Sequence, residues 1–280
     1  MDTVFWVRRL MQTKWLVVGL ALVAGGAVAA PGGKAVPKKA PEPIAPIATA
    51  LWSADLDTAA RAAGQLGLMD APAAHEALLD ALAFGLPAAV TIPALTSLSQ
   101  HPAPPDVLML TTYAHHRNPT IRSAALNVIA RYPDPKARQA VIAGLHDPMG
   151  IVRGAAAAAA AAGHVRESTE ALFALLAKGE EPAARALAQL ADPDLARKIA
   201  EQLGQVPDAS LALCLGLVLK RADFGPDTAR VEIVRSIAKI QDAAAVTALT
   251  EYIDATPKNP PRPSRHEAEM VVGARLGGGK

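Results

Sequence analysis

The side chains of this sequence that could bind a metal or transfer a proton are few and scattered. A histidine precedes a glutamate at His75-Glu76 and at His266-Glu267, which lie far apart along the chain. His115 and His116 are adjacent, but neighbouring residues of a helix point about 100° apart, so both rings cannot easily reach one ion. A structural or solvated role is therefore the favoured interpretation of each histidine.

Other catalytic patterns are missing from the sequence as well. No glycine-rich phosphate loop follows a strand, and no nucleophile elbow is present. Glu167 and Glu170 have no histidine partner nearby, and Cys214 lies among leucines, which is typical of a small buried hydrophobe. The sequence therefore predicts no catalytic residue, no metal and no cofactor. An enzyme with a dispersed His/Glu site is the alternative.

Composition and charge favour a helical protein with a mildly acidic body. The chain has 280 residues, of which 51% are hydrophobic but only 4% aromatic, and alanine and leucine dominate. The net charge of +2 combines +4 in residues 1–47, −5 in residues 48–256 and +3 in residues 257–280. Because a nucleic-acid-binding body normally has a basic face, we expect no nucleic-acid partner.

The N-terminus has the order of a secretory signal. Arg8, Arg9 and Lys14 precede an apolar run over 15–24, and Ala27-Val28-Ala29 matches a signal-peptidase site. We expect residues 1–29 to be a signal peptide cleaved before Ala30, with Met1 or Met11 as the start. The protein is then periplasmic or secreted. If the segment stays uncleaved, it anchors the protein to the membrane, facing the periplasm.

The rest of the chain divides into a linker, a long helical region and a tail. Residues 30–50, rich in proline and lysine, are expected to form an extended linker, and the basic tail 256–280 is expected to be disordered. Between them, residues 51–255 alternate helical segments with short breaks that contain proline, glycine or aspartate. Helices are expected near 55–67, 71–84, 87–100, 104–116, 119–131, 135–145, 149–163, 166–178, 181–191, 193–204, 208–222, 226–240 and 242–255.

One of these helices consists largely of alanine and indicates how the others must pack. Asp147 is a suitable N-cap, Pro148 fits the first helical position, and residues 155–162 are all alanine. Gly163 is a natural helix stop. A helix with such small side chains is stable only where neighbouring helices approach it closely. We therefore expect it to be an inner element of a stack.

An Arg-x-x-Ala pattern repeats at intervals of about thirty residues. It begins at Arg122, Arg153 and Arg185, and Arg61 lies about two periods earlier, whereas Ile92 takes the arginine position in between. Two helices per period predict stacked helical hairpins, in which each arginine reaches an aspartate or a carbonyl of the adjoining repeat. The next match, Arg235, comes late, so we expect an extra helix near 208–222 or a shift of register. The residues assigned to this structural ladder are Arg61, Arg122, Asp147, Arg153, Arg185 and Arg235.

The spacing Asp147-Pro148, Val152-Arg153 and Ala156 resembles HEAT repeats, especially the short bacterial kind seen in phycobilisome lyases. The resemblance implies an all-α fold, a right-handed α-solenoid of stacked antiparallel hairpins with about six repeats. It also implies ligand binding on the concave face, lined by the second helix of each hairpin. One HEAT-like enzyme type, a di-iron hydroxylase, carries several His-Glu pairs at repeat spacing, which this chain lacks.

We therefore expect an exported, non-enzymatic scaffold that binds a protein or a peptide, and the alternative is a structural component of an envelope complex. The polar stripes of the second helices are expected to form the binding surface, with an apolar end near Met109 and Tyr113 that suits an extended amphipathic peptide. The full predicted surface consists of Asp106, Met109, Tyr113, His116, Lys136, Gln139, Arg166, Glu170, Arg197, Lys198 and Glu201.

Overall fold

A computed structural model describes residues 43–277, and over this range the regular elements are all helical. The thirteen helices expected from the sequence are present within a few residues of their expected bounds, and two more lie at the ends. The elements are α1 (Ile44–Ala50), α2 (Leu56–Gly67), α3 (Pro72–Phe84), α4 (Ala88–Leu98), α5 (Asp106–Tyr113), α6 (Pro119–Ile129), α7 (Pro135–Gly144), α8 (Gly150–Ala162), η2 (Arg166–Ser168), α9 (Thr169–Ala177), α10 (Glu181–Leu190), α11 (Pro193–Ala200), α12 (Asp208–Lys220), α13 (Asp227–Ala238), α14 (Ala243–Ala255) and α15 (Pro263–Gly277).

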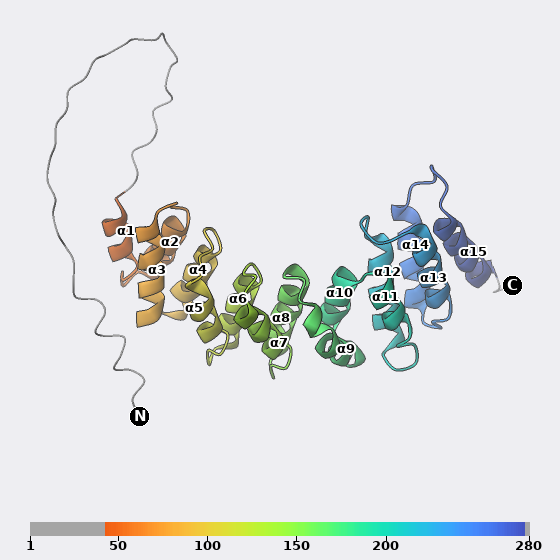
Figure 1. The fold of residues 1–280 in the computed structure, drawn as a ribbon, viewed down its shortest axis with the longest axis horizontal. Coiled ribbons are helices and arrows are strands. Elements are labelled where there is room, and N and C mark those ends of the chain that lie inside the picture. Colours follow the sequence, from red (N-terminus) through yellow and green to blue (C-terminus); the bar gives the residue numbers. More distant parts are fainter. Residues whose placement is uncertain (1–42, 278–280) are drawn as a thin grey trace, which may run out of the picture. The chain divides into compact units, whose positions relative to one another are not determined.

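The helices form two layers, and successive helices along the chain alternate between them (Figure 1). In the first layer α2, α4, α6, α8, α10, α12 and α14 each contact the next member. In the second layer α3 contacts α5, α5 contacts α7, α11 contacts α13, and α13 contacts α15. Each helix can bury its apolar side only against neighbours in both layers, so the row shares one continuous core. This arrangement is the expected α-solenoid, with seven helices in its first layer.

Small residues let the first-layer helices approach closely. Ala155, Ala156, Ala157, Ala159, Ala160 and Ala161 of α8 are all buried, as expected for an inner element. Between α2 and α4 the approach needs glycine, because a Cβ atom on Gly67 would lie 2.5 Å from Cβ of Ser97. The alanine-rich composition is therefore what allows this layer to pack so tightly.

The start of α8 differs from the expectation. The helix begins at Gly150 and Met149 is its N-cap, so Asp147 and Pro148 lie in the turn before it. Asp147 Oδ1 accepts a hydrogen bond from the Met149 amide at 2.9 Å, and the same carboxylate binds Arg122. The aspartate thus shapes the turn between α7 and α8 and does not cap the helix.

Of the two alternatives expected after Arg185, the extra helix is wrong, whereas the Arg-x-x-Ala pattern does shift its register there. α12 contacts α10 and α14 within the first layer, so the helix near 208–222 is an ordinary member of the row. Arg235 lies on α13, which belongs to the second layer. Its Arg-x-x-Ala match is therefore not in register with the pattern of Arg122 and Arg153, and α12 simply lacks the arginine.

Both ends of the helical region extend further than the sequence indicated. The linker was expected to reach residue 50, but α1 forms over Ile44–Ala50 and packs on α2 and α3. The tail was expected to be disordered, but α15 packs on α13 and α14. Ser264 is buried there, its amide and hydroxyl both donate to the Asp227 carboxylate, and its Oγ lies 2.6 Å from the Tyr252 hydroxyl oxygen. Composition alone predicted disorder for the tail. It carries no information about these partners, because they come from helices distant in the sequence.

The predicted signal peptide, residues 1–29, and the linker up to residue 42 lie outside the described residues. Within residues 43–277 no helix combines the length and the apolar character that a membrane crossing requires.

Candidate functional site

The repeated arginines fix the turns that precede their own helices. Arg122 donates to both carboxylate oxygens of Asp147 at 2.8 Å, and its Nη1 donates to the carbonyls of His116 and Arg117. Arg153 repeats this arrangement one period later with Glu180 as its acid and two turn carbonyls as acceptors. The predicted contact with an aspartate of the adjoining repeat is therefore confirmed for Arg122, whereas Arg153 reaches a glutamate there.

The other arginines of the predicted ladder behave differently. Arg61 donates to Thr58 and Arg185 to Glu181, so both stay within their own helix. Arg235 donates to Glu267 of α15. Sequence reasoning missed Arg221, whose Nη1 donates to the carbonyls of Ala188 and Ala191. Contacts between repeats thus come from arginines at several positions, and the Arg-x-x-Ala pattern alone does not find them.

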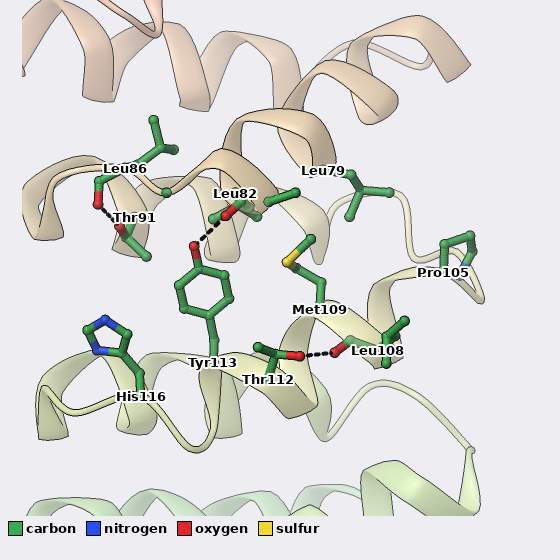
Figure 2. Close-up of a pocket in the computed structure, with 12 residues that line it drawn as sticks. Leu79, Leu82, Leu86, Thr91, Pro105, Leu108, Met109, Thr112, Tyr113 and His116 are labelled. Atoms are coloured by element: carbon green, nitrogen blue, oxygen red, sulfur yellow. Dashed lines mark hydrogen bonds between the residues drawn. The ribbon is translucent and has the colours of Figure 1, made fainter. Parts of the chain in front are cut away.

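A hollow of about 640 Å³ lies between α3, α4 and α5 (Figure 2). Its walls are mostly apolar, and Leu108 at its edge is 69% exposed. Met109, Tyr113 and His116 from the predicted surface all line it. The lining comprises Leu79, Leu82, Ala83, Gly85, Leu86, Thr91, Pro105, Leu108, Met109, Thr112, Tyr113 and His116.

Tyr113 forms the centre of this apolar pocket. Its hydroxyl donates to the Leu82 carbonyl at 2.7 Å, so the ring bridges α5 and α3 (Figure 2). Burial raises the pKa of the Tyr113 phenol above its usual value. The His116 ring stacks beside it, with centroids 6.0 Å apart and planes inclined by 26°. The pocket therefore offers aliphatic walls and an aromatic floor, with a single imidazole at one end.

A second hollow, of about 400 Å³, adjoins the first at His116, which lines both. It lies between the α5–α6 turn, α7 and the α7–α8 turn, and its lining includes Arg117, Arg122, Ala140 and Asp147. Lys136 precedes Ala140 by one helical turn on α7 and is exposed. We call the two hollows together the α3–α7 groove, which has an apolar end and a polar end.

Asp106, which was expected on the binding surface, is instead fully buried beneath it. Its Oδ1 lies 2.6 Å from His75 Nε2, and its Oδ2 accepts from the Tyr132 hydroxyl at 2.7 Å and from the Ala103 amide at 2.9 Å. The helical spacing was correct, but the Asp106 side chain, at the start of α5, faces three neighbouring segments that exclude solvent from it. This network joins α3, α5 and the segment after α6 that contains Tyr132. None of its contacts was predicted from the sequence.

The remaining residues of the predicted surface lie exposed on successive second-layer elements. Arg166 donates to Asp192, the N-cap of α11, at 2.6 Å, and Arg197 pairs with Asp194 at 3.2 Å. The α3–α7 groove has none of these residues in its lining. The exposed set is Lys136 and Gln139 on α7, Arg166 in η2, Glu170 on α9, Arg197 and Lys198 on α11, and Glu201 at its C-cap.

Groups that could hold a metal or act as a nucleophile do not gather in the described part of the chain. No cluster of three or more His, Cys, Asp or Glu side chains suitable for a metal ion occurs between residues 43 and 277. Cys214 is fully buried in α12, and burial raises the pKa of its thiol to about 12, which leaves it protonated near neutral pH.

The fold and these repeated turns define a class, the α-solenoids built from short helical repeats. The family described as HEAT repeats matches residues 107–191, which span α5 to α10, so the chain contains HEAT repeats there. No curated protein matches this sequence.

Solved structures with the same architecture include a Kap121p mutant, which is 15% identical with a TM-score of 0.50 over 82% of this chain. This chain covers only 29% of Kap121p, and at this identity the likeness shows the fold alone. The complex of CpcE and CpcF of phycocyanin lyase from Nostoc sp. PCC7120 is 17% identical with a TM-score of 0.47. That match covers 88% of this chain and 99% of the matched chain.

Proposed function

We propose that this HEAT-repeat protein is an exported, non-enzymatic scaffold that binds another protein or a peptide across its second-layer helices. The α3–α7 groove is the observation that carries the proposal, because an open hollow of about 640 Å³ with apolar walls is suited to anchor side chains. Polar side chains continue along α7, α9 and α11, which suits the rim of a protein interface. The family match supports a scaffold, since stacked repeats present extended surfaces.

Export rests on the order of charge, apolar run and small residues in residues 1–29. We expect the mature protein to begin at Ala30. N-terminal sequencing of protein recovered from the periplasm or the medium measures this directly. Recovery of an intact N-terminal segment, with Trp15, in the membrane fraction would contradict cleavage and favour an anchored component of the envelope.

The binding surface is tested by the paired substitution Tyr113→Ala with Arg197→Glu. Truncating an aromatic anchor typically costs about 2 kcal/mol or more of binding free energy, which is about a thirtyfold loss of affinity. We therefore expect the variant to lose the partners that the wild-type chain captures from an envelope extract, as measured by quantitative mass spectrometry.

Arg131→Glu is the matched control, because Arg131 is exposed and lies just past α6, a first-layer helix. Thermal unfolding of each variant separates lost binding from lost folding, since Tyr113 also makes the hydrogen bond to Leu82. A folded double variant that still captures every wild-type partner would show that binding takes place elsewhere.

A further inference from the structure

The turn between α5 and α6 differs in charge from the corresponding turn one repeat later. Aligning Arg122 with Arg153 places His116 opposite Asp147 and Arg117 opposite Pro148. Both turns are held by the same device, an arginine that donates to two turn carbonyls. The backbone is therefore held in the same way in the two turns, but the first carries His115, His116 and Arg117, whereas the second carries His146 as its basic side chain.

His116 has a defined hydrogen-bonding role in this turn. Its Nδ1 lies 3.0 Å from the backbone nitrogen of Asn118, whose N–H donates to it, so Nδ1 is an acceptor. In the neutral ring Nε2 then carries the proton and is a donor. In Figure 2 the ring stands at the end of the pocket beside Tyr113, and its outer nitrogen points away from the α5 backbone. A hydrogen-bond donor is thus available where the apolar end of the α3–α7 groove meets its polar end.

The charges around the polar hollow leave an excess of positive charge. Arg122 and Asp147 neutralise each other through their two-point contact. Arg117 is exposed, and among residues 43–277 no ion pair involves it. His115 and His116 line the same hollow as Arg117. This basic spot stands out because residues 48–256 carry a net charge of −5.

We propose that the α3–α7 groove binds an extended peptide segment in which an apolar side chain is followed, within a few residues, by a carboxylate. The apolar side chain lies over Met109 and Tyr113, and the carboxylate accepts from His116 Nε2 and pairs with Arg117. Charge-assisted hydrogen bonds of this kind are the stronger ones and would fix the direction of the segment. The inference rests on the proposed function, because it names the chemistry of the segment that the scaffold binds.

The test is a selection of random phage-displayed dodecapeptides on the full chain. We expect the selected sequences to be enriched in an apolar residue followed by Asp or Glu. A synthetic peptide of the best sequence should bind at least about tenfold more weakly, about 1.4 kcal/mol, after its acid is changed to the amide. Arg117→Glu should weaken the acidic peptide similarly and should improve binding of a version carrying Lys in place of the acid. Affinities are measured by fluorescence anisotropy.

Two matched controls separate this chemistry from general effects. Arg131→Glu makes the same charge change away from the groove. Leu108→Asp removes an exposed apolar wall of the pocket, and Ile151→Asp makes the same kind of change on α8, where Ile151 is 55% exposed. We expect Leu108→Asp to reduce binding and both controls to leave it unchanged.

Two other outcomes are distinguishable. Peptides that lose binding with Leu108→Asp but show no acidic enrichment and no response to Arg117→Glu would overturn the carboxylate site and leave the scaffold proposal standing. If the selection enriches no sequence above background, or if the enriched peptides bind the Leu108→Asp variant unchanged, the groove does not bind peptides and this inference is overturned. The scaffold proposal is then decided separately, by the capture experiment with the Tyr113→Ala and Arg197→Glu double variant.

Discussion

Replacing Asp106 with alanine should lower the free energy of unfolding by about 3–5 kcal/mol, because it leaves three hydrogen-bond partners unpaired and each unsatisfied buried group costs about 1–3 kcal/mol. The carboxylate is fully buried and serves the His75 ring, the Tyr132 hydroxyl and the Ala103 amide. These groups lie in successive repeats, so the loss would weaken their mutual packing. Urea denaturation followed by circular dichroism measures the change.

Asp80→Ala is the control, because Asp80 is exposed on α3 and its substitution should change stability by less than about 0.5 kcal/mol. Tyr132→Phe removes one hydrogen bond of the network and should cost about 1–3 kcal/mol. An Asp106→Ala variant as stable as Asp80→Ala would show that the network contributes nothing to folding.

Replacing Arg122 with alanine should lower stability by about 1.5–3 kcal/mol near neutral pH, the range for hydrogen bonds to charged groups. Arg122 and Asp147 have side chains that are each only 13% exposed, and the arginine also holds the turn carbonyls. The exposed Arg131→Ala is the matched control. Chemical denaturation of the three proteins at pH 7 gives the comparison.

The same pair predicts a pH dependence with a definite sign. The hydrogen bond from Arg122 is the main cause that holds the pKa of Asp147 below its usual range. A depressed pKa contributes stability that is present above the unfolded value, about 3.9 for aspartate, and is lost as pH falls through the folded value. The gap in the free energy of unfolding between wild type and Arg122→Ala should therefore narrow as the pH falls below about 4. A gap of the same size at pH 2 and pH 7 would contradict this assignment.

The sequence by itself determined the helices and their stacking. Proline, aspartate and glycine at the breaks set where helices begin and end, and these are local effects that a sequence shows directly. Asn118 and Asp134, for example, accept hydrogen bonds from the backbone of the helices they precede. The buried alanine run of α8 followed from its composition, because helices with small side chains require close neighbours.

The tertiary structure decided which side chains meet, and this changed both the site and the ends of the fold. Asp106 was placed on the surface by helical spacing, yet His75 and Tyr132 enclose it from about one repeat away on either side. Helix α15 was expected to be disordered because its composition is polar, but Asp227 and Tyr252 supply its buried partners. In both cases the deciding contacts join segments distant in the sequence, and periodicity within one helix carries no information about them.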